Sequence, residues 1–199
     1  MKVLIVGASG TIGRAVAVEL GRRHDIIAAG RSSGDVRIDI THPASMVAAF
    51  KKVGRIDAVV STAGHVKFAP FVDMRGEDYE IGNRDKLMGQ VNLVLIGRES
   101  VADGGSFTLT TGVLDSDPIR GGSSASLVNG AVNAFVMAAA IEMPRGLRIN
   151  AVSPGLIQEA AEAFAPFFRG FEMVPAARAA LAYSKSVEGS QTGRVYRVL

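Results

Sequence analysis

Three glycines spaced three residues apart, directly after the first apolar run, constrain the fold of this chain more than any other feature. The run Val3–Val6 predicts a strand, and the glycines belong to the turn that opens the next helix. One glycine permits a sharp turn, the second admits a phosphate to the backbone, and the third lets helix and strand pack closely. The amides and dipole of the helix start favour an anion. The turn therefore predicts a nucleotide diphosphate site, formed by Gly7, Ser9, Gly10, Thr11, Ile12 and Gly13.

Short β-branched runs alternate with helical patterns along the rest of the chain. Further strands are predicted at Ile26–Ala29, Val36–Asp39, Ala58–Ser61, Ser106–Thr110, Arg148–Val152 and Gly193–Val198. Helices are predicted at Thr11–Arg23, Pro43–Val53, Ser123–Glu142, Gln158–Phe168 and Pro175–Ser186, with a further long helix inside Asp78–Val101. Seven strands joined by right-handed helical crossovers predict an α/β, three-layer Rossmann fold with a doubly wound seven-stranded parallel sheet. No linker or repeat interrupts the 199 residues, so we expect a single domain, 1–199.

The composition argues against several kinds of site. The chain has no cysteine, which excludes disulfides and thiolate chemistry, and its three histidines are widely spaced, so no metal site is expected. The net charge is +3, but the basic residues are scattered, and no nucleic-acid partner is expected. The longest apolar stretch, Ala131–Ile141, is too short to span a bilayer. We expect a cytoplasmic protein without a membrane partner.

The tip of the second predicted strand bears on the choice of nucleotide. Folds that bind NAD(H) usually carry an acidic residue there, which binds the ribose 2′-hydroxyl. This chain has Arg31 instead, followed by Ser32 and Ser33. A guanidinium fork matches the geometry of a 2′-phosphate, so NADP(H) is the predicted cofactor. The alternative interpretation of Arg31 is a solvated surface arginine.

Four further segments, together with the glycine turn, make the chain resemble the short-chain dehydrogenase/reductase family over nearly its whole length. They are Asp39-Ile40-Thr41, Ser61-Thr62-Ala63-Gly64, Asn150–Gly155 and Thr192-Gly193. The resemblance implies that Asp39 contacts the adenine and that Ala63 and Gly64 form a turn beside the cofactor. It also implies that Pro154, Gly155 and Ile157 lie near the nicotinamide amide. Without the resemblance, Asp39 could merely end its strand, and Pro154-Gly155 could be turn chemistry only.

The chain departs from this family at the residues that move a proton. The family uses Tyr-x-x-x-Lys on its fifth helix, a spacing that puts both side chains on one helix face. The resemblance aligns these positions with Ala125, which has no proton to give, and Asn129, whose amide carries no charge. The family's serine aligns with Thr110 or Thr111, where a hydroxyl survives.

A lysine on the preceding helix offers a replacement for the missing ammonium. Where the family has an asparagine in an Asn-x-x-Gly setting, this chain reads Lys86-Leu87-Met88-Gly89. We hypothesise an exchange in which lysine and asparagine trade places, so that Lys86, Thr111 and Asn129 are the candidate catalytic residues. Lys86 could then contact the nicotinamide ribose, hydrogen-bond Asn129 or donate a proton once desolvation lowers its pKa. The alternative is a surface lysine that extends into solvent. A second candidate proton donor is His65, directly after Gly64.

Three interpretations of the function follow from this pattern. The first is an NADP(H)-dependent oxidoreductase with altered acid–base residues, acting on a small-molecule carbonyl or alcohol substrate. The second is a catalytically inactive NADP(H)-binding sensor or structural module, and a third, weaker option is a scaffold that binds no nucleotide. The resemblance also implies a homodimer or homotetramer, and the apolar segment Gln158–Val174 suggests an apolar substrate or a partner surface.

Overall fold

The sheet of this protein is parallel throughout, and its strand order reverses beside the first strand. The computed structural model describes residues 1–164 and 166–199. Its main sheet has seven strands in the order β3-β2-β1-β4-β5-β6-β9. The strands are β1 Lys2–Val6, β2 Asp25–Gly30, β3 Val36–Arg37, β4 Ile56–Ser61, β5 Val101–Thr110, β6 Arg148–Pro154 and β9 Val195–Val198. The predicted doubly wound Rossmann fold is confirmed, with its switch point between β1 and β4, where ligands bind in such sheets.

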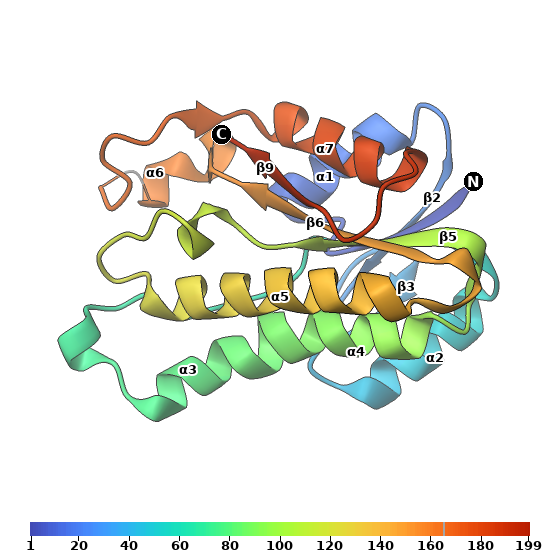
Figure 1. The fold of residues 1–199 in the computed structure, drawn as a ribbon, viewed down its shortest axis with the longest axis horizontal. Coiled ribbons are helices and arrows are strands. Elements are labelled where there is room, and N and C mark those ends of the chain that lie inside the picture. Colours follow the sequence, from blue (N-terminus) through green and yellow to red (C-terminus); the bar gives the residue numbers. More distant parts are fainter. Residues whose placement is uncertain (165) are drawn as a thin grey trace.

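Helices cover both faces of the sheet (Figure 1). On one face lie α1 Thr11–Leu20 and α7 Ala176–Glu188, which share a core cluster with β1 and β4. On the other face lie α2 Pro43–Val53, α4 Met88–Gly97 and α5 Ser123–Glu142, which pack on a second cluster that includes Phe107 and Ile149. The two clusters show why the central strands read as continuous apolar runs, since both sides of each strand are buried.

Helix α5 is long and apolar enough to cross a membrane by length and composition, with a mean hydropathy of 1.5 over its most apolar window. Its buried residues include Val128, Val132 and Val136, which belong to the core cluster on the sheet. Burial of this side of α5 against the sheet accounts for part of its apolar composition.

Two segments differ from the sequence prediction. The long helix within 78–101 is α3 Gly76–Gly82, a π-helical turn Asn83–Leu87, and then α4. The helix predicted over 158–168 is wrong in its second half: a 3₁₀ turn Gln158–Ala160 and the single-turn α6 Ala161–Phe164 precede Pro166, and the described residues 166–168 are not helical. Proline lacks the amide that a helix needs and restrains the residue before it. Residue 165 of that prediction lies outside the described residues.

A second, two-stranded sheet, β7 Leu156–Ile157 with β8 Met173–Val174, was not predicted because its strands are only two residues long. It ties the start of the 158–172 segment to its end. The loops that follow β4, β5 and β7 therefore meet at the carboxyl edge of the main sheet, on the left of Figure 1.

Candidate functional site

The glycine turn between β1 and α1 has the geometry that the sequence predicts. Gly7 has a φ of +86°, and a Cβ there would lie 2.9 Å from the Ala63 amide nitrogen. A Cβ on Gly13 would lie only 2.1 Å from the Gly7 carbonyl oxygen. Glycine is therefore required at Gly7 for the turn and at Gly13 for helix–strand packing.

The start of α1 leaves backbone donors available for an anion. The N-cap residue is Gly10, which has no side chain, so no cap hydrogen bond forms there. The first amide of the helix that finds a carbonyl in the preceding turn is that of Arg14, which donates to the Gly10 carbonyl at 2.9 Å. The amides of Thr11 and Ile12 are thus free to bind a phosphate oxygen, as in other anion sites at helix starts.

A pocket of about 300 Å³ opens over this turn and runs to the tips of the neighbouring strands. It contains seven of the predicted cofactor residues: Gly7, Ser9, Arg31, Ser32, Asp39, Ala63 and Gly64. It also contains residues that were not predicted to bind a cofactor, namely Val6, Gly30, Ser33, Ile38, Ile40, His65 and Asp85. Asp85 lies directly before Lys86, and its carboxylate accepts the His65 amide at 3.0 Å.

Asp39 is prepared as a hydrogen-bond acceptor within this pocket. Its Oδ1 accepts the amide of Thr41 at 2.9 Å and the Thr41 hydroxyl at 2.7 Å, and His42 lies 3.3 Å from Oδ2. The hydrogen bond from the Thr41 side chain is the main reason that the pKa of Asp39 lies below its usual value. Free helix amides, a glycine floor and an ionised acceptor together fit the diphosphate and base of a dinucleotide.

The candidate lysine lies in the π-helical turn between α3 and α4. Such a turn carries one residue more than α geometry needs, and it often marks a functional site. The stem of Lys86 packs directly on Gly64, because a Cβ added to Gly64 would lie 2.6 Å from Lys86 Cγ. This contact places Lys86 beside the turn that lines the dinucleotide pocket.

The ammonium of Lys86 points inward. Its Nζ donates to Asn129 Oδ1 at 2.7 Å and to the Thr111 carbonyl at 3.0 Å. The interpretation of Lys86 as a solvated surface lysine is therefore wrong, and the predicted contact with Asn129 is confirmed. Desolvation lowers the pKa of Lys86 from 10.5 to about 8, close enough to neutrality for proton transfer.

Asn129 and Thr111 complete this arrangement in different ways. Asn129 is 3% exposed, and its Nδ2 donates to the Gly112 carbonyl at 3.2 Å, so both ends of the amide are engaged. Thr111 is 4% exposed; its carbonyl accepts from Lys86, while its hydroxyl donates to the Val152 carbonyl at 3.4 Å. The Thr110 hydroxyl is held by the Ser61 carbonyl at 2.5 Å and by Tyr183 at 2.7 Å.

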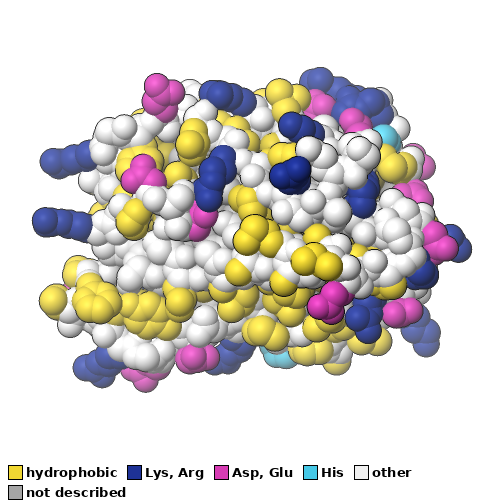
Figure 2. Space-filling view, viewed as in Figure 1, with side chains coloured by type: hydrophobic (Ala, Val, Ile, Leu, Met, Phe, Trp, Pro, Cys, Tyr) yellow, Lys and Arg dark blue, Asp and Glu magenta, His cyan; other side chains and the backbone are white. Residues whose placement is uncertain are grey.

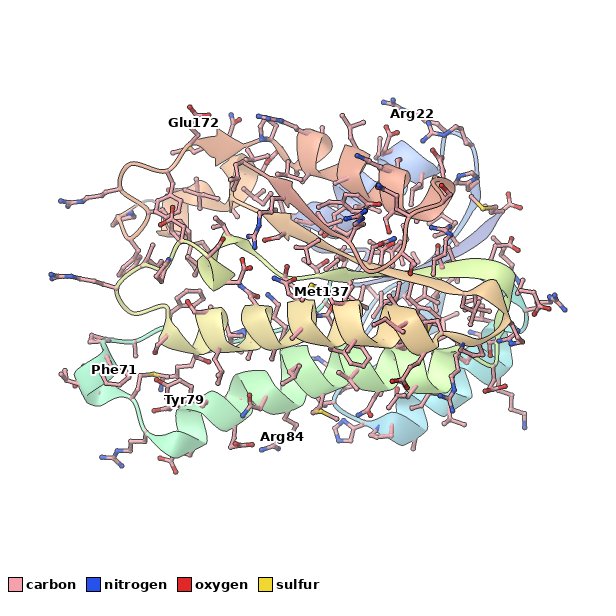
Figure 3. All side chains as sticks on the ribbon, in the orientation of Figure 1. Arg22, Phe71, Tyr79, Arg84, Met137 and Glu172 are labelled. Carbon is pink, nitrogen blue, oxygen red and sulfur yellow. The ribbon has the colours of Figure 1, made fainter. Side chains whose placement is uncertain are left out.

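The surroundings of Ala125 are apolar and closed. Ala125 is 3% exposed and forms a buried cluster with Val113 and Leu114. Half-buried residues pack on this cluster: Val66, Ile119, Phe168 and Phe171. Tyr79, labelled in Figure 3, forms a hydrogen bond with the Ser123 hydroxyl at 2.9 Å at the start of α5.

The segment after β6 lies on the other side of the site. Gly155 donates its amide to the Val198 carbonyl at 2.8 Å, and Pro154 is the last residue of β6. Ile157 is buried in a small cluster that also receives Ile12 from the first turn of α1. The structure thus brings this segment beside the glycine turn, although Pro154, Gly155 and Ile157 do not line the pocket described above.

An ion pair fastens the loop after β5 to this segment. Asp115, with a side chain 7% exposed, accepts from the two terminal nitrogens of Arg197, Nη1 at 2.9 Å and Nη2 at 2.7 Å, and from Asn133 Nδ2 at 2.8 Å. Ser153 Oγ lies 3.5 Å from the same carboxylate. The loop that supplies carbonyls to Lys86 and Asn129 is therefore held against β6 and β9.

Comparison with known proteins identifies the family. The family model described as enoyl-(acyl carrier protein) reductase matches residues 7–199. Versicolorin reductase 1 from Dothistroma septosporum is 28% identical over 182 residues, which cover 78% of this chain and 68% of the reductase. Oxidoreductase UcpA from Escherichia coli K12 is 31% identical over 130 residues, covering 60% of this chain and 49% of UcpA.

Solved structures agree with this result over the full chain. The protein lin1944 from Listeria innocua is 50% identical, with a TM-score of 0.98 and full coverage of both chains. A small-chain dehydrogenase solved in complex with NADPH is 27% identical, with a TM-score of 0.88, and the match covers 100% of this chain and 96% of that one. The chain, with its glycine turn, its seven-stranded parallel sheet and a family match from Gly7 to its last residue, belongs to the short-chain dehydrogenase/reductase family of oxidoreductases.

Proposed function

We propose that this protein is an NADP(H)-dependent oxidoreductase in which Lys86 donates and accepts the proton of the reaction. In other members of the family, this proton transfer depends on the tyrosine and the lysine. The observation that carries the proposal is the inward-facing ammonium of Lys86, bonded to Asn129 and Thr111 and packed on Gly64. In this proposal Ala125 and Asn129 occupy the family's tyrosine and lysine positions. Lysine and asparagine have then traded places across the same site.

The choice of NADP(H) rests on the tip of β2. Arg31 is exposed in the dinucleotide pocket, flanked by the hydroxyls of Ser32 and Ser33, and the pocket has no acidic residue at that strand tip. A guanidinium fork and two hydroxyls suit the 2′-phosphate of NADP(H). The described residues at the tip of β2 include no carboxylate that could bind the free 2′-hydroxyl of NAD(H). The likeness to a dehydrogenase solved with NADPH supports the same choice.

Bound NADP(H) supplies or accepts the hydride, and the chain's own residues supply the rest. During carbonyl reduction, Lys86 Nζ donates a proton to the substrate oxygen as that oxygen gains negative charge. Asn129 and the Thr111 carbonyl keep the ammonium in place before transfer, and its lowered pKa makes it a stronger acid than a solvated lysine. In the oxidative direction, neutral Lys86 accepts the proton of the alcohol. The substrate is a small-molecule carbonyl or alcohol.

One observation favours the second candidate, an inactive NADP(H)-binding module. The place where a tyrosine would donate is filled by apolar packing around Ala125. The two functions are separated by measuring thermal stability with NADPH and with NADH, and then NADPH oxidation on a panel of carbonyl compounds. A shift with NADPH, turnover in the wild type and loss of turnover in Lys86→Met support the enzyme. A rise in melting temperature with NADPH but without turnover supports the inactive module. An unchanged melting temperature with both nucleotides would contradict both candidate functions.

We also propose that the protein acts as a homodimer or homotetramer in the cytoplasm, without a membrane or nucleic-acid partner. The outer side of α5 exposes apolar side chains, among them Leu127, Met137 and Ile141, and Met88 and Leu95 are exposed on the adjacent α4. Figure 2 shows apolar side chains gathered over these two helices, and Figure 3 labels Met137 on the same side. Light scattering of the wild type and of Ile141→Lys tests the assembly, since a monomeric wild type would contradict it.

A further inference from the structure

A second pocket, of about 410 Å³, lies at the carboxyl edge of the sheet and does not contain the dinucleotide residues. Its walls come from three loops: residues 68–70 after β4, residues 119–121 after β5, and Phe164 and Phe167 from the segment after β7. The volume falls in the range of small-molecule sites, which is about 300–1,000 Å³.

The loops around this pocket are fixed to one another. The Ala69 amide donates to the Gly121 carbonyl at 3.1 Å, which joins the first two loops. The rings of Phe68 and Phe164 lie 5.8 Å apart at 55°, which joins the first loop to the third. Ile119 also belongs to the cluster around Ala125, so the floor of the pocket continues into the core. The pocket is therefore formed before any ligand arrives.

The chemistry of the lining is apolar, with a single charge. Phenylalanines, an alanine, a proline and an isoleucine form the walls, and Arg120 stands among them. Arg120 is exposed and forms no ion pair with residues 1–164 or 166–199. A cation at the rim of an apolar cavity complements a ligand with an apolar body and one anionic group.

The two loops that hold Lys86 also lead to this pocket. Phe68 follows Gly64, which touches Lys86, by four residues, a reach of at most about 14 Å. Ile119 lies on the loop that begins at Thr111, whose carbonyl accepts from Lys86. Both loops thus run from a contact with Lys86 to the wall of the pocket, so one molecule can have its carbonyl at Lys86 and its far end in the pocket.

We infer that this pocket binds the apolar body of an elongated anionic molecule, a chain or linked rings with one carboxylate or similar group held by Arg120. That this molecule is the carbonyl substrate rests on the proposed function. The binding itself does not, because the pocket is complete without the dinucleotide residues.

Calorimetry with 2-naphthoate and its neutral analogue 2-naphthamide tests the binding. The wild type is expected to bind the naphthoate at least tenfold more tightly, because only the anion engages Arg120. Arg120→Gln is expected to abolish this preference, and Phe167→Ala to weaken both ligands at least fivefold. The matched controls Arg178→Gln and Phe71→Ala, exposed residues that do not line the pocket, are expected to change neither affinity by more than twofold. Equal affinities in the wild type, or an unchanged preference in Arg120→Gln, would overturn the inference.

NADPH binding, measured in parallel by thermal shift, keeps the two proposals apart. Naphthoate binding without a thermal shift by NADPH supports the proposed pocket ligand and contradicts the proposed function. A thermal shift by NADPH without naphthoate binding supports NADP(H) binding and contradicts the proposed pocket ligand. Melting curves of each variant show whether it is folded, and Arg120→Lys, which keeps the charge, is expected to retain most of the anion preference.

Discussion

Lys86 Nζ lies 2.7 Å from Asn129 Oδ1, and the same ammonium lies 3.0 Å from the Thr111 carbonyl oxygen. These bonds hold a cation between the π-helical turn Asn83–Leu87, helix α5 and the start of the loop after β5, and no carboxylate is among its hydrogen-bond partners in the described residues. Desolvation then acts unopposed on the lysine, which is the physical reason for its lowered pKa.

Stability should depend on pH through Lys86. Its pKa is about 8 in the folded chain, below the 10.5 of an ordinary lysine. Between these values the unfolded chain binds more protons, so the free energy of unfolding rises with pH across this window. Relative to Lys86→Met, the wild type should gain up to about 3 kcal/mol between pH 8 and 10.5. Urea denaturation of both proteins at several pH values measures this, and a pH-independent difference would contradict the lowered pKa.

Reversing the exchange gives a sharper test of catalysis. Lys86→Asn and Asn129→Lys should each lower NADPH-dependent carbonyl reduction by about 10²-fold or more, because the proton donor is lost or two ammonium groups crowd one site. The double variant restores one lysine and one asparagine and should recover part of the rate. In the wild type, reduction should fall as pH rises through about 8, since only protonated Lys86 donates. A double variant no better than either single one would contradict the exchange, provided that NADPH affinity is unchanged.

Arg31→Ala should weaken NADPH binding by about 10- to 100-fold, the worth of one or two charge-assisted hydrogen bonds to a phosphate. NADH affinity should stay within about twofold, because NADH lacks the 2′-phosphate. Calorimetry with both nucleotides measures the effect, and Arg55→Ala, outside the pocket, is the control. Equal losses for the two nucleotides would mean that Arg31 does not meet the 2′-phosphate.

Two glycine-to-alanine variants should shift stability in opposite directions. Gly13→Ala should cost about 3 kcal/mol or more, because its Cβ would lie 2.1 Å from the Gly7 carbonyl oxygen. Gly130→Ala, in the middle of α5 with no atom within 4 Å of the added Cβ, should stabilise the chain by about 0.5–1 kcal/mol. Thermal denaturation checks both, and a tolerated Gly13→Ala would show that the helix can move away from the turn.

The sequence predicted the main sheet and the phosphate turn because both depend on local signals. The apolar run Val3–Val6 predicts a strand and the three glycines predict a turn, and neither prediction needs knowledge of how distant parts of the chain pack. The exchange of Lys86 and Asn129 was inferred from two family motifs, and their direct contact follows from the packing of the π-helical turn Asn83–Leu87 against α5. Asp85 and Arg120 could not be assigned from sequence, since their significance depends on which loops meet at the sheet edge. The prediction of a helix through Phe168 was wrong because it relied on the apolar periodicity of the segment, whereas Pro166 disfavours a continuous helix there.

The π-helical turn at Asn83–Leu87 means that the position of the Lys86 ammonium is set by residue count as well as by residue type. Deleting one residue from this turn would return the helix to ordinary α geometry, and the residues of the turn, Lys86 among them, would then project in other directions. Shortening this segment by one residue could therefore separate Lys86 from Asn129 even in a chain that keeps both of them.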